Sequence, residues 1–132
     1  MISQSLTLSL LEGRFAVCRL APGQEVPAWA AGGTFTSVTR TRDELSVVCS
    51  EGVVPAGTKC EGGWRLFQIE GPLDFGLIGI MASVTEPLAN AGVSIFALST
   101  FDTDYVMVKD ESVEKAIAAL AAAGHRVRRY PM

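Results

Sequence analysis

The residues best suited to chemistry lie in one short polar stretch, Ser99 to Asp104 (STFDTD). It places two Asp, two Thr, a Ser and a Phe between apolar runs, where a plain hairpin turn needs only a few polar residues. The carboxylate of Asp104, and in second place that of Asp102, would bind an ammonium or guanidinium group through a charge-assisted hydrogen bond. Because Asp and Thr also gather in tight turns, an ordinary polar turn is the alternative interpretation.

A second candidate is the stretch from Pro72 to Ile78, which leads into a predicted helix. Gly76 and Gly79 leave the backbone uncovered there, where free N–H groups and the helix dipole favour an anion such as an α-carboxylate. The stretch lacks the ending of a phosphate-binding loop and the spacing of a dinucleotide fingerprint. The glycines could therefore serve close packing of the helix on a sheet instead.

Catalytic and metal chemistry have little support in the sequence. A catalytic triad would have to use His125, the single histidine, which we expect to be a solvated residue after a helix end, interacting with the helix dipole. The basic cluster that follows it, Arg126, Arg128 and Arg129, is also expected to be solvated. No nucleophile elbow or metal-ligand spacing is present, so we expect no cofactor and no metal site.

The three cysteines form no C-x-x-C pair, which argues against a disulfide framework and a zinc site. We expect Cys18 and Cys49 to be small apolar residues on strands.

Composition limits the class of protein. The 132 residues are 48% hydrophobic and 19% charged, which predicts one ordinary globular domain or two small units sharing a core. A net charge of −3 supplies no basic stripe, which disfavours nucleic acids and anionic membranes as partners. The longest strongly apolar stretch, Phe75 to Met81, is far shorter than the roughly 20 residues that span a bilayer. The N-terminus has no positive n-region, so we expect a cytoplasmic protein.

The elements that must position these residues follow from hydrophobic periodicity and turn signals. In the first half we expect a hairpin around Glu12-Gly13, one helical turn in a loop at 21–33, a second hairpin, a loop at 51–63 and a strand. The predicted strands are Leu6 to Leu11, Phe15 to Leu20, Phe35 to Arg40, Glu44 to Cys49 and Trp64 to Glu70.

The second half predicts the order β-α-β-β-α-β. A helix over 76–91, bent or broken at Pro87 and ended by Gly92, is followed by strands at 93–99 and 105–109. Asp110 is a good N-cap for a second helix that stops at Gly124, and 127–130 can form a last strand. This order is typical of an α+β ferredoxin-like fold, in which four antiparallel strands carry two helices on one face.

A faint internal repeat relates the two halves at a shift of 60 residues. Val38-Thr39 then lies over Leu98-Ser99, and Val47-Val48 over Met107-Val108. A true duplication would make this a tandem of two units whose first copy has lost most of both helices. Two hairpins can also match by patterning alone.

The stretch from Glu70 to His125 resembles the ACT domain, in particular the tandem ACT proteins related to the CASTOR-type cytosolic arginine sensor. GPLDFGLIG, AGVSIFALST and STFDTDYVMVK carry the resemblance, which extends more weakly to LTLSLLEGRFAVCRL and FTSVTRTRDELSVVC. It implies a small-molecule binding module, usually for amino acids, that forms dimers or regulates larger proteins. The implied ligand-binding residues are Phe75, Gly76, Leu77, Ile78, Ser99, Thr100, Phe101, Thr103 and Asp104.

The resemblance also implies a division into a degenerate first ACT-like unit, residues 1–62, and a complete second unit, residues 63–132. Arginine sensors of this type in animals carry four such units, a number that a homodimer of this chain would supply. We expect no output domain beside these units, so that a signal would pass through a separate protein target.

Three functions are compatible with these observations. The first is a regulatory sensor that binds an amino acid or a similar small molecule without catalysis. The second is a structural or partner-binding module that has lost its ligand, which the eroded first unit favours. The third is a small enzyme that uses Asp102 or Asp104 with Ser99 or His125, and it predicts a carboxyl with a strongly shifted pKa in a cleft.

Overall fold

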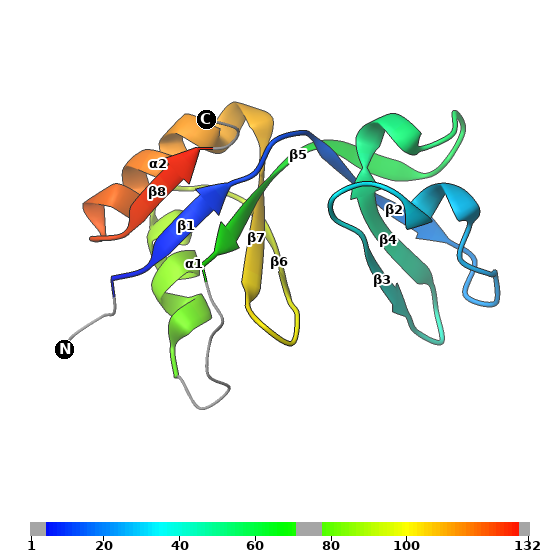
Figure 1. The fold of residues 1–132 in the computed structure, drawn as a ribbon, viewed down its shortest axis with the longest axis horizontal. Coiled ribbons are helices and arrows are strands. Elements are labelled where there is room, and N and C mark those ends of the chain that lie inside the picture. The colour runs from blue at the N-terminus through cyan, green and yellow to red at the C-terminus, as the bar shows by residue number, and fades with distance from the viewer. Residues whose placement is uncertain (1–4, 71–77, 130–132) are drawn as a thin grey trace. The chain divides into compact units, whose positions relative to one another are not determined.

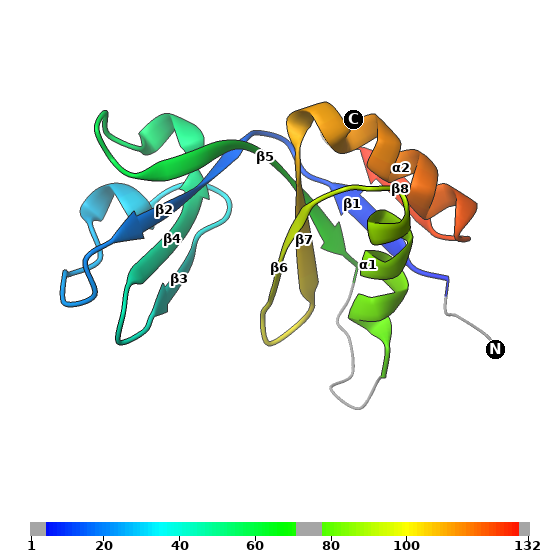
Figure 2. The ribbon, with the colours of Figure 1, turned by 180° about the vertical axis from the view of Figure 1, so that it is seen from behind.

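A computed structural model describes residues 5–70 and 78–129 and shows two compact units. Residues 13–64 form one unit, here called the inserted unit, and residues 1–12 and 65–132 form the other, the main unit. Figure 1 shows the elements of both and Figure 2 the same ribbon from behind. Within the described ranges, no helix is long and apolar enough to cross a membrane.

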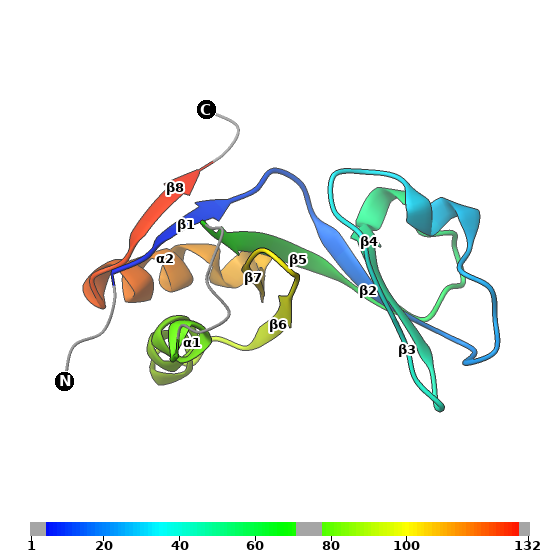
Figure 3. The ribbon, with the colours of Figure 1, turned by 60° about the horizontal axis from the view of Figure 1, so that its bottom comes forward.

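Among its described residues, the main unit contains five strands, two α-helices and one short 3-10 helix. They are β1 (Thr7–Leu10), the second half of β5 (Cys60–Ile69), α1 (Ile80–Asn90), β6 (Ile95–Ser99), β7 (Asp104–Lys109), the short 3-10 helix η3 (Asp110–Ser112), α2 (Val113–Ala122) and β8 (Arg126–Arg129). From β5 onward the order is β-α-β-β-α-β, and both helices lie on the same side of the sheet (Figure 3). The ferredoxin-like α+β fold predicted from the sequence is confirmed.

The strand β1 occupies a position that the sequence did not predict. It lies between β5 and β8, so that the sheet of the main unit has the order β6-β7-β5-β1-β8. Leu8 is paired antiparallel with Ile69 and parallel with Val127, which makes the sheet mixed. The expected hairpin of Leu6 to Leu11 with Phe15 to Leu20 is therefore wrong. Alternation of Leu residues shows which face of a strand is buried, but it does not identify the neighbouring strand.

The units also differ from the predicted division at residue 62. The N-terminal residues pair with the strands that follow residue 64, so they belong with the C-terminal part of the chain. Whether the two units descend from two ACT copies stays a prediction.

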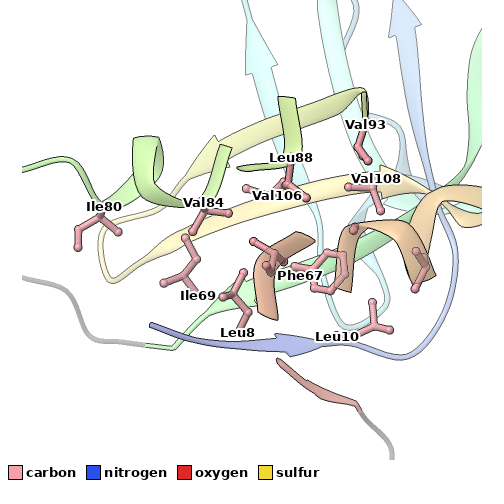
Figure 4. Close-up of a cluster of buried hydrophobic side chains, with 13 residues drawn as sticks. Leu8, Leu10, Phe67, Ile69, Ile80, Val84, Leu88, Val93, Val106 and Val108 are labelled. Atoms are coloured by element: carbon pink, nitrogen blue, oxygen red, sulfur yellow. The ribbon is translucent and has the colours of Figure 1, made fainter. Parts of the chain in front are cut away.

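The core of the main unit lies between the sheet and the two helices. Ile80, Val84 and Leu88 project from α1 at helical spacing toward apolar side chains of the strands (Figure 4). The buried set is Leu8, Leu10, Phe67, Ile69, Ile80, Val84, Leu88, Val93, Val106, Val108, Val113, Ala116 and Leu120. The core fixes the ends of β5, β6 and β7, where the predicted site residues lie.

The two helices end as predicted but begin differently. Gly92 and Gly124 have φ values of 77° and 96°, and the N–H groups of Val93 and His125 bond back to Leu88 and Leu120, as in glycine-ended helices. Pro87 does not end α1, which continues to Asn90. Asp110 is not the N-cap of α2: it begins η3, and its carboxylate lies 3.2 Å from the Arg65 guanidinium.

The expectation that His125 is solvated is wrong, because its side chain is only 6% exposed. Nε2 lies 2.8 Å from the Ser83 carbonyl oxygen, and Nδ1 accepts a hydrogen bond of 3.1 Å from the Leu6 N–H. These two bonds fold the chain after α2 against α1 and β1.

Two of the predicted solvated arginines also have partners. Arg128 forms an ion pair of 2.6 Å with Glu70, and Arg129 one of 2.7 Å with Glu114.

The inserted unit is a small sheet with the order β3-β4-β2-β5. It consists of β2 (Phe15–Leu20), η1 (Ala28–Ala31), β3 (Ser37–Arg40), β4 (Leu45–Ser50), η2 (Glu51–Val53) and the first half of β5. The predicted helical turn and the second predicted hairpin are confirmed. The loop expected at 51–63 is shorter than predicted, since β5 begins at Cys60. The β3–β4 and β6–β7 turns each hold four residues, as the faint repeat at a shift of 60 residues predicts. Equal turn lengths do not show that one unit arose by duplication of the other.

Candidate functional site

The polar stretch forms the turn between β6 and β7 and closes on itself. The Thr100 N–H donates to the Thr103 carbonyl at 2.8 Å, and the Thr103 N–H donates to the Thr100 hydroxyl at 3.3 Å. Ser99 and Asp104 are the last paired residues of the two strands. The turn therefore has one defined conformation that starts and ends at these two side chains.

Thr103 connects this turn to the end of β5. Its side chain is 5% exposed, and its hydroxyl donates a hydrogen bond to the Ile69 carbonyl. Ile69 is the last residue of β5, from which the chain continues toward α1. The sequence left open whether the hairpin turn lies at this end of the sheet, and the hydrogen bond shows that it does.

Asp104 is held by its partner on the neighbouring strand. The Ser99 hydroxyl donates to Oδ1 of Asp104 at 2.7 Å, and Asp104 is partly exposed. Side chains alternate along a strand, so Asp104 shares the face of Val106 and Val108, which pack toward the helices. The structure thus places a carboxylate at the end of the sheet, on the side that carries α1.

Asp102 has different neighbours from Asp104. It is exposed, and its charge acts on Tyr105, whose side chain alternates to the opposite face of the sheet. Burial first, and the Asp102 charge second, raise the pKa of the Tyr105 hydroxyl. Phe101, beside it at the tip of the turn, is 80% exposed.

The start of α1 lies at the same end of the main unit (Figure 2). Gly79 is the N-cap residue, with a φ of 80°, and it has no side chain that could cap the N–H groups of the first turn. The first helical bond joins the Ser83 N–H to the Gly79 carbonyl, so the N–H groups of residues 80–82 have no acceptor in the helix. The first turn contains no acidic residue that would compensate the positive end of the helix dipole.

The residues just before this helix are only partly described. Ile78 is 95% exposed, while Phe75, Gly76 and Leu77 lie outside the described residues. Of the predicted ligand-binding residues, the structure brings five together on the β6–β7 hairpin and places Ile78 beside the helix start. The five are Ser99, Thr100, Phe101, Thr103 and Asp104.

This arrangement suits an amphoteric ligand. A carboxylate can hold an ammonium or guanidinium group, and uncapped helix N–H groups can hold a carboxylate. Acid–base catalysis has less support, since both ring nitrogens of His125 are already engaged in hydrogen bonds within the main unit.

Sequence reasoning missed a polar cluster at the end of β5. Glu70 accepts hydrogen bonds from the Ser9 hydroxyl at 3.0 Å and from the Arg128 guanidinium at 2.6 and 3.1 Å. The hydrogen bonds from Arg128, which act most strongly, and the one from Ser9 hold the pKa of the Glu70 carboxyl below its usual value of 4.5. No local signal could predict the cluster, because its members are about 60 residues apart along the chain.

A small cavity of about 230 Å³ lies elsewhere in the main unit. Its lining comes from α1 and the end of α2, namely Ser83, Glu86, Pro87, Asn90, Ala123 and His125. None of the predicted ligand-binding residues lines it.

Comparison with known proteins gives two matching family models. The model of the ACT domain matches residues 59–122, and a model described as an N-terminal domain matches residues 13–57. The second model therefore covers most of the inserted unit.

Two similar sequences and one protein with a similar fold were also found. A crystal structure of a protein from Agobacterium tumefaciens is 39% identical, with a TM-score of 0.93 over 98% of this chain and 97% of that one. The human cytosolic arginine sensor for mTORC1 subunit 1 is 38% identical over 58 residues, 43% of this chain, and the match spans only 18% of the sensor. The regulatory subunit of aspartate kinase from Thermus thermophilus shares the fold, with a TM-score of 0.56 over 86% of this chain and 93% of that one, at 14% identity.

Proposed function

We propose that this chain, which belongs to the ACT domain family, is a regulatory protein that binds an amino acid or a closely similar molecule. In this proposal it acts without catalysis, as a ligand-controlled part that signals to a protein target. The names of two relatives, an arginine sensor and a regulatory subunit of aspartate kinase, support a regulatory role. The word cytosolic in the name of the first supports a cytoplasmic location.

The observation that carries the proposal is the fixed position of Asp104. Its carboxylate is oriented by Ser99, and the turn that carries it is anchored to β5 through Thr103. A carboxylate held in place loses little conformational freedom when a ligand cation arrives, so little binding free energy is spent on ordering it. The start of α1 lies at the same end of the main unit (Figure 2), and the N–H groups of its first turn would supply donors for the α-carboxylate of the ligand.

The site is proposed to be completed by a second copy of the chain. In a homodimer, the segment of Phe75, Gly76, Leu77 and Ile78 from one copy would face the hairpin of the other. The exposed Ile78 and Phe101 side chains would then be covered by the ligand or by the partner copy. Binding would favour one arrangement of the two copies to the extent that the ligand contacts differ between arrangements.

The partner-binding module without a ligand remains the second candidate. The inserted unit favours it, because residues 13–64 contain no α-helix and, as a degenerate ACT copy, would lack the helical layer. A module of this kind would bind its protein target equally well with and without any amino acid.

A screen of the purified chain against the twenty amino acids tests the proposal. A ligand at 100 times its dissociation constant should stabilise the native state by about 2.7 kcal/mol, a shift that a thermal melt resolves. We expect the melting temperature to rise selectively with one amino acid or a group of related ones. We also expect the chain to sediment as a dimer. Unchanged melting with all twenty would favour the partner-binding module.

A further inference from the structure

The inserted unit brings the three cysteines of the chain together. We propose that Cys18 and Cys60 form a reversible disulfide there when the chain meets a low-molecular-weight disulfide such as oxidised glutathione. The proposal concerns the inserted unit alone and does not depend on the ligand site of the main unit.

The strand register places Cys18 and Cys60 directly opposite each other on β2 and β5. The neighbouring pair is hydrogen-bonded, since the Arg19 N–H donates to the Lys59 carbonyl at 2.9 Å. Hydrogen-bonded and non-hydrogen-bonded pairs alternate along antiparallel strands, so Cys18 and Cys60 form a non-hydrogen-bonded pair. The Cα atoms of such pairs are typically about 4.5 Å apart. Disulfides span Cα separations of about 4.4 to 6.8 Å, so the bond can form without backbone movement.

The thiols already face one another. Residues opposite each other on paired strands point to the same face of the sheet. Besides burial, which acts most strongly, Cys49 and Cys60 both raise the pKa of the Cys18 thiol, as expected for neighbouring thiols. All three cysteines are in the free thiol form in this structure.

Exposure determines which thiol reacts first. Cys60 is exposed on β5, whereas Cys18 and Cys49 are buried in the apolar cluster of the inserted unit. Burial shields the Cys18 thiol from an external disulfide and raises its pKa to about 12, so Cys18 reacts more slowly than an exposed thiol and only with a sulfur beside it. The external disulfide therefore reacts at Cys60.

The reaction balances in two exchange steps. The Cys60 thiolate attacks one sulfur of the external disulfide, forms a mixed disulfide and releases one small thiolate. Cys18 then attacks the Cys60 sulfur while its proton passes to the departing small thiolate, which leaves as the second small thiol. Two cysteine thiols have been oxidised and one external disulfide has been reduced to two thiols. An excess of reduced thiol reverses both steps.

Cys49 provides a matched control inside the same cluster. It is paired with Ala16 on β2 and is therefore diagonal to Cys18 rather than opposite it. Cys49 is buried whereas Cys60 is exposed, so the external disulfide reacts at Cys60 and Cys18 should link to Cys60 and not to Cys49.

The test uses the whole chain in buffers with a rising share of oxidised glutathione. After the remaining thiols are alkylated, intact mass should show loss of two of the three reactive thiols with no glutathione retained. Peptide mapping should then identify the Cys18–Cys60 link. Cys49→Ala should keep the link, and Cys60→Ser, a change at an exposed position, should abolish it with an unchanged circular dichroism spectrum.

Three outcomes would overturn the proposal. They are glutathione retained on Cys60 while Cys18 stays reduced, a link between Cys18 and Cys49, and survival of all three thiols in fully oxidised glutathione.

Discussion

The imidazole of His125 replaces the hydrogen bond that Pro87 removes from α1. Proline has no N–H, so the Ser83 carbonyl, four residues earlier, loses its usual donor in the helix. His125 lies with Nε2 2.8 Å from that oxygen, while Nδ1 accepts the Leu6 N–H. A carbonyl on one side and an N–H on the other fix the neutral tautomer with its proton on Nε2. This contact explains how α1 continues through a residue that was expected to bend or break it.

Removing the imidazole should weaken the main unit. His125→Ala leaves the Ser83 carbonyl and the Leu6 N–H without partners, and each part-buried orphan costs about 1 kcal/mol or more. We expect a loss of about 2 kcal/mol in the free energy of unfolding. Urea unfolding followed by circular dichroism measures it. A loss close to zero would mean that the two hydrogen bonds contribute nothing.

Pro87→Ala provides the partner experiment. Alanine restores an N–H that can bond to the Ser83 carbonyl within α1, so His125→Ala should cost about 1 kcal/mol less in this background. The double-mutant cycle isolates the coupling between the two residues. Additive effects would show that His125 does not compensate for the proline.

Glu70 should make stability depend on pH in the acid range. The pKa of the Glu70 carboxyl is lower in the folded chain than its usual value of 4.5, so the unfolded chain binds more protons at acid pH. The free energy of unfolding should therefore fall as the pH drops from about 4.5 through the lower pKa of the folded chain. Glu70→Gln removes this contribution. Denaturant midpoints at several pH values should show wild type above the variant at neutral pH, with the gap narrowing below pH 4.5. A constant gap would contradict the interpretation.

Thr103 should anchor the hairpin turn to β5. Thr103→Val keeps the shape of the side chain but removes its donor to the Ile69 carbonyl, which should cost about 1 kcal/mol of stability. The exposed Thr100 on the same turn provides the control, since Thr100→Val affects only bonds within the turn. Urea unfolding of both variants should show the larger loss for Thr103.

The position of β1 can be tested through its core residue Leu8. Leu8 is fully buried between the sheet and the helices of the main unit, so Leu8→Ala should cost about 2 to 5 kcal/mol. The control is Val26→Ala, because Val26 is 44% exposed. A small effect at Leu8 would argue that the N-terminal strand is not part of the main unit.

Much of the fold could be predicted from local patterns. The helix periodicity, the two glycine stops and the second hairpin are encoded within a few residues of each other. The insertion of β1 between β5 and β8 could not be predicted in this way, because strand alternation carries no information about partners. The burial of His125 was missed for a similar reason: its two partners, Leu6 and Ser83, are 119 and 42 residues away.

In the candidate site too, local features could be predicted from the sequence and long-range contacts could not. The polar turn and its two terminal side chains were visible in the sequence as an excess of hydrogen-bonding groups between apolar runs. The bond from Thr103 to Ile69, which places the turn at the end of β5, joins residues 34 apart and depends on the register of the sheet.

Calorimetric titration of the amino acid selected by the screen is the most direct test of the proposed site. Wild type, Asp104→Asn and Asp102→Asn should be titrated side by side, since both variants lose one carboxylate from the same hairpin. The account predicts that Asp104→Asn weakens binding about 10-fold or more, the loss of one charge-assisted hydrogen bond, while Asp102→Asn binds like wild type. Equal affinity of Asp104→Asn and wild type, or a larger loss with Asp102→Asn, would contradict it.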